Sequence, residues 1–215
     1  MIMERTFFDR AAVDVAPELL GCVLEHDTAE GLVAVELTEV EAYMGEADPA
    51  SHAYRGRTPR NAVMFGPPGY AYVYFTYGMH FCVNLVCLPA GTASAVLLRA
   101  GRIVAGEELA RQRRASNGNG TRELARGPAR LCQALGIDRA QNGADVCSAD
   151  SALRIRGPMG GTTDRSVNEI LTGPRVGVSS GAEVAWRFWL SGEPTVSAYR
   201  PHVPRKRKPV TGRRA

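Results

Sequence analysis

The segment 61–98 limits what this chain can fold into more than any other part of the sequence. It contains no Asp, Glu, Lys or Arg, so most of it must be buried. A helix that spans a membrane needs about 20 unbroken apolar residues. The segment is instead interrupted by Gly66, Pro67, Pro68, Gly69, Gly78, Pro89 and Gly91. We therefore expect it to form short buried strands of a globular domain, with no membrane association.

The elements expected along the chain predict an α+β fold. Alternating apolar and polar residues, and short apolar runs between turn residues, indicate strands at 22–27, 32–43, 70–76, 80–88, 94–100, 153–156, 175–178 and 187–190. Helices are expected at 10–20, with an interruption near Pro17, and at 104–114 and 128–135. Because most strands precede the helices rather than alternate with them, we expect a largely antiparallel sheet.

The positive charge of the chain is concentrated at its C-terminal end. No acidic residue follows Glu193, and the residues after it carry a charge of +7, so residues 1–193 sum to −3. From Pro194 onward we expect a mobile basic segment. With 215 residues of ordinary composition, the chain suits one domain over 1–200 and a disordered basic tail over 201–215. Such a tail either binds polyanions through counterion release or is simply solvated, and the sequence leaves both alternatives open.

The cysteines and the N-terminus favour a reducing compartment. There are five cysteines with no CxxC motif, and the first residues lack the apolar core of a secretory signal. We therefore expect thiols rather than disulfides and a cytoplasmic protein. The four histidines and five cysteines are not clustered as zinc ligands would be, so no metal site is expected.

The segment 33–43, VAVELTEVEAY, contains the most informative polar residues. In a strand, Glu39, Glu41 and Tyr43 lie on the same face as the apolar residues at 33, 35 and 37. Two carboxylates at i and i+2 are about 7 Å apart, close enough to influence each other's titration. Either the strand leaves the core at a polar site, or the two acids are solvated at a strand end.

Aromatic and basic residues gather in the neighbouring segments. Tyr70, Tyr72 and Tyr74 share one strand face, and Tyr77 precedes Gly78 at an expected turn, where its ring could stack on bases or wedge between them. These tyrosines could equally be ordinary sheet residues. The loop 51–61, SHAYRGRTPRN, combines one histidine, one tyrosine and three arginines. It suits phosphate contacts, or it is a solvated surface loop.

Two further polar residues lie in apolar strands. Arg99 follows the run AVLL, so we expect a carboxylate partner for it, either Glu41 or Glu39. Asn84 needs hydrogen-bond partners, in a site or in the sheet itself. Together these segments supply carboxylates, an arginine, a histidine and stacking aromatics. That set suits hydrolysis of a sugar-linked substrate through a cationic transition state, and binding of a flat base.

The order and spacing of these residues resemble the alkyladenine (3-methyladenine) DNA glycosylase family. The resemblance covers residues 5–198 and rests on TEVEAY at 38–43, His52, RTPRN at 57–61, MF at 64–65, YVY at 72–74, YGM at 77–79, FC at 81–82, Asn84, VLLR at 96–99, GPARLCQAL at 127–135 and RVGV at 175–178. It implies a single mixed domain with a curved sheet flanked by helices. It also implies an enzyme that flips a damaged purine out of duplex DNA and hydrolyses its N-glycosidic bond, leaving an abasic site and using no cofactor.

The resemblance further implies roles for individual residues. Glu41 would be the general base that activates water, and Arg99 would hold that water and the carboxylate. The residues implied to line the base pocket are Tyr43, His52, Tyr74, Asn84 and Val176. Those implied to fill the gap in the duplex are Tyr77, Met79 and His80, the last standing where some relatives have an aromatic residue. Arg57 and Arg60 would contact the DNA backbone, and the protein would act as a monomer on double-stranded DNA containing alkylated or deaminated purines.

Two other classes of function remain as alternatives. A non-catalytic nucleic-acid-binding module would use the same aromatic residues and tail without needing Glu41 or Arg99. A glycoside hydrolase acting on sugars would depend on Glu39 as much as on Glu41, and would not depend on Tyr77.

Overall fold

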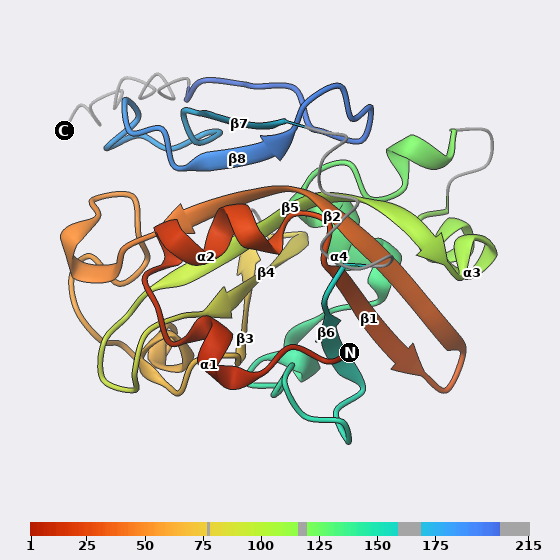
Figure 1. The fold of residues 1–215 in the computed structure, drawn as a ribbon, viewed down its shortest axis with the longest axis horizontal. Coiled ribbons are helices and arrows are strands. Elements are labelled where there is room, and N and C mark those ends of the chain that lie inside the picture. The colour runs from red at the N-terminus through yellow and green to blue at the C-terminus, as the bar shows by residue number, and fades with distance from the viewer. Residues whose placement is uncertain (77, 116–119, 159–168, 203–215) are drawn as a thin grey trace, which may run out of the picture.

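The computed structural model describes residues 1–76, 78–115, 120–158 and 169–202. Within them the chain forms a curled antiparallel sheet with four α-helices packed around it (Figure 1). The predicted class, a single mixed α+β domain with a curved and largely antiparallel sheet, is therefore confirmed.

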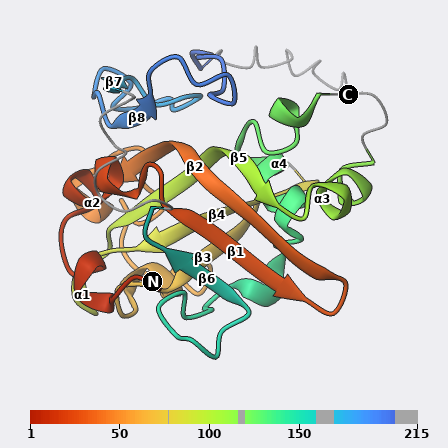
Figure 2. The same ribbon diagram turned by 45° about the vertical axis from the view of Figure 1, so that its right-hand side comes forward.

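The strands form one sheet whose main run has the order β3–β4–β5–β2–β1–β6. Their bounds are β1 Val23–Thr28, β2 Gly31–Tyr43, β3 Ala71–Thr76, β4 His80–Val86, β5 Ala95–Ala105, β6 Leu153–Arg156, β7 Ile170–Gly173 and β8 Arg187–Leu190. β8 pairs with β2 at Glu39, Val40 and Glu41, and β7 pairs with β8 (Figure 2). The second half of β2 thus has β5 on one side and β8 on the other.

The helices cover both faces of this sheet. Their bounds are α1 Arg5–Phe8, α2 Ala12–Leu19, α3 Glu107–Arg113 and α4 Pro128–Leu135, with short 3₁₀ turns at Gly45–Ala47, Ala62–Phe65, Thr121–Glu123 and Arg139–Gln141. α2 packs on β2 and β5 from one side, and α4 packs on β4 and β5 from the other (Figure 1). Both contribute fully buried residues, such as Leu19 and Leu131, to one hydrophobic core.

The side chains of β2 alternate between the two faces as the sequence predicts. Leu37 pairs with Gly101 and Val40 with Leu98, so the register is the same on both sides of a local irregularity at Thr38. Glu39 and Glu41 therefore follow Leu37 on the face toward α4. Between them, Val40 and Ala42 are buried in the core on the face toward α2.

Several predicted bounds differ from the structure. β5 continues to Ala105 and α3 begins only at Glu107, because Gly106 turns the chain with a φ of 71° against Leu32. The predicted interruption near Pro17 is wrong, since α2 runs unbroken through it. Burial of an apolar side chain such as Leu19 contributes about 1.5–3 kcal/mol and offsets the one hydrogen bond that proline removes. The predicted strand at 175–178 is also wrong, because this segment forms a turn.

The chain beyond Pro194 also differs from the prediction. Thr195 is buried, and its hydroxyl forms a hydrogen bond of 2.8 Å with Thr38. The Ser197 main-chain N–H donates to Glu39, and the main-chain oxygen of Arg200 accepts from Gly177. The prediction of a mobile segment from Pro194 is therefore wrong for residues up to 200. Of the predicted tail over 201–215, residues 203–215 lie outside the described part of the chain.

None of the described helices combines the length and the apolar character that crossing a membrane requires. All five cysteines lie in the described residues and carry thiols, as predicted.

Candidate active site

One row of paired residues crosses the sheet on the face toward α4. Tyr72 pairs with Asn84 across β3 and β4, Asn84 with Leu97 across β4 and β5, and Leu97 with Glu41 across β5 and β2. Directly paired residues place their side chains on the same face of a sheet. Four strands therefore bring together polar residues that are far apart in the sequence.

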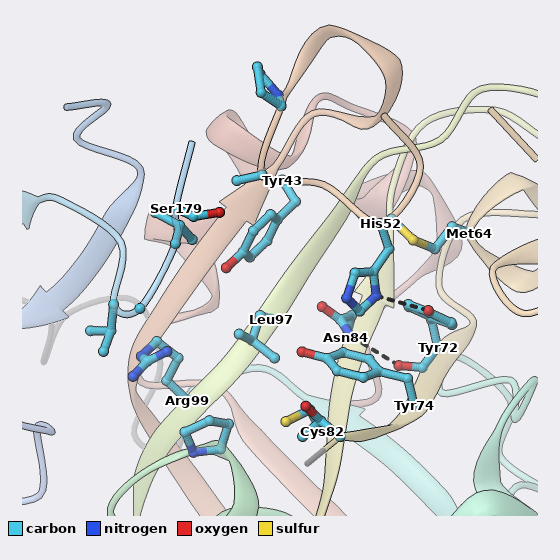
Figure 3. A pocket seen from close by; sticks show the side chains of 17 residues that line it. Tyr43, His52, Met64, Tyr72, Tyr74, Cys82, Asn84, Leu97, Arg99 and Ser179 are labelled. Atoms are coloured by element: carbon cyan, nitrogen blue, oxygen red, sulfur yellow. Dashed lines mark hydrogen bonds between the residues drawn. The ribbon is translucent and has the colours of Figure 1, made fainter. Parts of the chain in front are cut away.

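A pocket of about 340 Å³ opens over this row. This volume lies in the range of small-molecule sites, about 300–1,000 Å³. Tyr43 stands on one side of the pocket and His52 and Tyr74 on the other (Figure 3). The remaining lining residues are Pro49, Ala50, Met64, Tyr72, Thr76, Cys82, Asn84, Leu97, Arg99, Pro128, Val176, Gly177, Val178 and Ser179. Rings on two opposing sides suit a flat aromatic ligand.

Glu41 lies fully buried behind the pocket, and its carboxylate has three partners. Its Oε1 accepts a hydrogen bond of 2.7 Å from the Val176 main-chain N–H and lies 3.2 Å from Arg99 Nη1. Its Oε2 accepts a hydrogen bond of 2.8 Å from the Tyr43 hydroxyl. All three partners line the pocket, so the carboxylate is one side chain away from it. The alternative of acids solvated at a strand end is wrong, because Glu39 and Glu41 are both 0% exposed.

Arg99 lies between the two carboxylates of β2. Its Nε donates to Glu39 Oε1 at 2.7 Å, while its Nη1 faces Glu41. The sequence predicted one partner or the other, and the structure shows both. Burial favours the uncharged form of Arg99, but the charges of Glu41 and Glu39 outweigh it and raise the pKa of Arg99. The guanidinium therefore stays charged at the edge of the pocket.

The Arg175 guanidinium packs against the ring of Tyr43. It lies 4.7 Å from the centre of the Tyr43 ring and 5.2 Å from that of Trp186. It forms a two-pronged ion pair with Asp48 at 2.5 and 2.9 Å, in which both side chains are almost fully buried. Because Val176 follows Arg175 directly, the same ion pair fixes the main-chain N–H that contacts Glu41.

Three rings form the opposite side of the pocket. The His52 and Tyr74 rings meet edge-on with centres 4.4 Å apart, and Tyr72 stacks beside Tyr74 at 5.6 Å. His52 Nδ1 lies 3.1 Å from the Tyr72 hydroxyl. His52 remains exposed, but partial desolvation against this wall and the charge of Arg60 lower the pKa of His52, so its ring is neutral at neutral pH. Burial raises the pKa of Tyr72 to about 12, which keeps its hydroxyl protonated.

Asn84 is both a structural amide and a pocket residue. Its Nδ2 donates a hydrogen bond of 3.1 Å to the Tyr72 main-chain oxygen, and the residue is 5% exposed. The two alternatives left by the sequence are therefore not exclusive. The hydrogen bond fixes the amide where it meets any ligand in the pocket (Figure 3).

The remaining predicted site residues lie around the β3–β4 turn and the loop beside it. Met79 is 68% exposed and His80 is exposed next to it, while Tyr77 lies outside the described residues. Arg60 donates to the main-chain oxygen of Phe75 at the end of β3, which places the loop against this turn. Arg57 is exposed on the same loop. Thr76 lines the pocket, so the turn adjoins its mouth.

Sequence reasoning gave several residues that build the site no role in it. Met64, Tyr72 and Arg175 contributed to the family resemblance without an assigned role. The residues that it did not single out are Asp48, Trp186, Arg187 and Ser197. Asp48 and Arg175 lie in segments rich in Gly and Pro, where periodicity gives no sign of burial. The signal that could have found them is chemical: a charged residue in a mainly apolar context implies a partner of opposite charge. Across the described part of the chain, no group of three or more His, Cys, Asp or Glu side chains could hold a metal ion.

Known proteins match this chain over most of its length. Residues 6–194 match the model of a family described as methylpurine-DNA glycosylase. A protein of Streptomyces avermitilis is 55% identical over 209 residues, covering 96% of this chain and 95% of its own length. A protein of Leifsonia xyli subsp. xyli is 53% identical over 205 residues, covering 92% of each chain. The names of both contain the words 3-methyladenine DNA glycosylase.

Proposed function

The chain belongs to the methylpurine-DNA glycosylase family, and on this premise we propose that it excises alkylated or deaminated purines from duplex DNA. The reaction is hydrolysis of the N-glycosidic bond, which leaves an abasic site. The observation that carries this proposal is the buried Glu41 carboxylate directly behind a pocket with aromatic rings on opposing sides.

The pocket suits a purine that has been flipped out of the duplex. In this proposal the base enters the space between Tyr43 on one side and His52 and Tyr74 on the other, which are the rings that line the pocket. A base alkylated on a ring nitrogen carries positive charge, and a cation over an aromatic ring gains about 0.5–2 kcal/mol. Because the lowered pKa of His52 keeps its ring neutral, this wall does not repel such a base. Asn84, held by Tyr72, meets the edge of the base and can obstruct the exocyclic amine of normal guanine.

Glu41 activates the attacking water in this proposal. The water lies against the pocket face of Arg99 and Val176, the two partners that fix Glu41 Oε1. Its oxygen forms a bond to C1′ of the sugar as the bond from C1′ to the base nitrogen breaks. The electron pair of that bond passes to the base, and the proton of the water passes to Glu41. An alkylated ring becomes neutral in this way, whereas a deaminated base leaves as an anion and takes up a proton from solvent. The negative carboxylate also offsets the positive charge that develops on the sugar.

DNA outside the pocket meets the β3–β4 turn and the loop that carries Arg57 and Arg60. We assign Tyr77, Met79 and His80 to the gap left by the flipped nucleotide, a position that offsets lost stacking. Arg57 and Arg60 neutralise phosphates beside it. The protein acts as a monomer at the nucleoid in the cytoplasm, where chromosomal DNA lies.

Single-turnover excision tests this function. Two duplex oligonucleotides are needed, one methylated and one carrying hypoxanthine, each with wild type and Glu41→Gln. We expect Glu41→Gln to lose about 10²–10⁴-fold in rate, the usual contribution of a general base, and to keep its affinity for abasic DNA. Glu36→Gln is the matched control, because Glu36 lies on the same strand but pairs with Arg102 near the surface.

The outcomes separate the functional classes. Release from both duplexes by wild type but not by Glu41→Gln supports the proposal and its general base. Release from methylated DNA alone means that the reaction needs a cationic leaving group. If neither base is released while DNA is bound tightly, the protein is a binding module and the proposal is wrong.

A further inference from the structure

A second buried carboxylate lies beside the proposed general base and has no part in the reaction described above. Glu39 is 0% exposed and is not among the residues that line the pocket. Its Oε1 accepts from Arg99 Nε at 2.7 Å, from Arg187 Nε at 2.8 Å and from the Ser197 hydroxyl at 2.8 Å. Its Oε2 accepts from the Ser197 main-chain N–H at 2.7 Å. Of these three partner residues only Arg99 lines the pocket, whereas all three partners of Glu41 do, so Glu39 lies further from a bound substrate than Glu41.

Arg99 connects Glu39 to Glu41. Nε of its guanidinium is bound to Glu39, and this leaves Nη1 directed at Glu41 Oε1, 3.2 Å away. A guanidinium is planar, so fixing one edge sets the direction of the other. The position of Arg99 at the pocket therefore depends on a group outside the pocket.

The segment 193–200, here called the C-terminal clasp, holds Glu39 in turn. Besides the two hydrogen bonds from Ser197, its main-chain oxygen at Val196 accepts from Arg126, which lies just before α4. At its end the main-chain oxygen of Arg200 accepts from Gly177, the residue after Val176. The clasp thus reaches both protein groups that fix Glu41 Oε1. It reaches Arg99 through Glu39 and also directly, because Arg99 Nη2 donates to the Ser197 hydroxyl at 3.3 Å. It reaches Val176 through Gly177.

The charges of this cluster are balanced. Glu39 and Glu41 face Arg99 and Arg187, and the four side chains are at most 7% exposed. Burial would raise the pKa of Glu39, but Arg99, Arg187 and the Ser197 N–H outweigh it and lower that pKa. Glu39 is therefore ionised and shares the charge of Arg99 with Glu41. Without Glu39, Arg99 would have Glu41 as its one carboxylate partner among the described residues.

We propose that Glu39 is a positioning residue for the excision reaction, and that the C-terminal clasp completes the active site by fixing Glu39 through Ser197. This rests on the proposed function, because it assigns to Glu39 the alignment of Arg99 on the general base. Glu39 neither touches the substrate nor transfers a proton.

Glu39→Gln tests the proposal with little change of shape. We expect it to slow single-turnover excision by about 10–100-fold, the effect of losing a hydrogen bond between charged groups. Affinity for abasic DNA stays unchanged, since Glu39 does not line the pocket. Glu25→Gln is the control, because Glu25 is a partly buried glutamate that pairs with Arg156 on the neighbouring strand, away from the pocket and the clasp. It should excise at the wild-type rate.

A double-mutant cycle separates positioning from a general structural effect. If Glu39 acts through Arg99, then adding Glu39→Gln to Arg99→Gln changes the excision rate little further. Multiplication of the two single effects would overturn the proposal, as would a wild-type rate for Glu39→Gln. The proposed function fails separately, in the absence of excision by the wild-type protein.

Ser197→Ala keeps the proposal testable if Glu39→Gln does not fold. It removes the hydroxyl that donates to Glu39 and accepts from Arg99, and it leaves the main-chain bond to Glu39 in place. We expect a smaller loss of excision rate, about threefold to tenfold, for one hydrogen bond to a charged group that keeps other donors. The control is Ser151→Ala, which removes a hydroxyl bonded to Leu153 far from the site. Equal rates for the two serine variants would contradict the role of the clasp.

Discussion

The hydroxyl of Tyr43 donates a hydrogen bond of 2.8 Å to Glu41, two residues earlier on the same face of β2. The Tyr43 ring also lines the pocket and lies 4.7 Å from the Arg175 guanidinium. The residue proposed to stack on the base is thus linked directly to the proposed general base. The alternation of a single strand produces this link, because residues at i and i+2 share a face.

Two substitutions of Tyr43 separate stacking from hydrogen bonding. Tyr43→Phe keeps the ring, so we expect affinity for lesion-containing DNA to stay near the wild-type value while excision slows, because Glu41 loses one of its donors. Tyr43→Ala removes the ring as well, and should weaken lesion binding by about 1–3 kcal/mol, the usual contribution of stacking one base. Equilibrium binding and single-turnover rates measure the two effects. Equal binding losses in both variants would show that the ring does not stack.

Asp48 is expected to contribute strongly to stability. It is the carboxylate partner of Arg175, and both side chains are almost fully buried. Asp48→Asn leaves the Arg175 charge uncompensated and should lower the free energy of unfolding by about 3–5 kcal/mol. Denaturant titration measures this loss. Asp150→Asn, at an exposed position, is the control and should stay within about 0.5 kcal/mol of wild type. A similarly small change for Asp48→Asn would contradict the importance of the pair.

The strands that build the site could be predicted because their residues are patterned locally. Alternation placed Glu39, Glu41 and Tyr43 on one face of β2, and the structure agrees. The helix at Pro128–Leu135 was predicted at its observed bounds, with Pro128 at its first position and Gly136 after its end. In these cases the local secondary-structure preference of the sequence and the tertiary packing favour the same structure.

The contacts between distant segments could not be predicted in the same way. Arg175 and Val176 lie in a turn whose conformation depends on the ion pair with Asp48, far away in the sequence. The C-terminal clasp is polar and rich in turns, yet Thr195 and Ser197 are held by partners on β2. Such segments are ordered by tertiary hydrogen bonds, and those partners are not visible from local pattern.

We expect the free energy of unfolding to decrease as the pH falls below about 6.5, the usual pKa of a histidine side chain. His26 is 4% exposed, and burial lowers its pKa in the folded state. Below about pH 6.5 the unfolded chain binds a proton that the folded chain excludes, so the free energy of unfolding decreases with falling pH, by at most about 1.4 kcal/mol per pH unit for one group. His52, whose pKa is also lowered, acts in the same direction.

Denaturant titrations between pH 5 and 8 check this dependence, the range in which histidines titrate. His26→Gln should flatten the pH dependence of the free energy of unfolding. His202→Gln, at an exposed position, is the control for replacing a histidine by glutamine. The same slope in wild type and His26→Gln would refute the assignment.

The end of the chain should divide at residue 200 into two parts with different effects on the reaction. Deleting 201–215 removes six basic residues and leaves the clasp intact. We expect the single-turnover excision rate to stay nearly unchanged. The binding constant for DNA should depend less on salt. The slope of its logarithm against the logarithm of the salt concentration should become shallower by about 0.9 for each phosphate that the tail neutralises in the full-length protein. Deleting 194–215 also removes Ser197 and the hydrogen bond with Gly177, and should abolish most excision. An unaltered salt slope after the first deletion would argue against DNA binding by the tail, and full excision after the second would exclude the clasp from the active site.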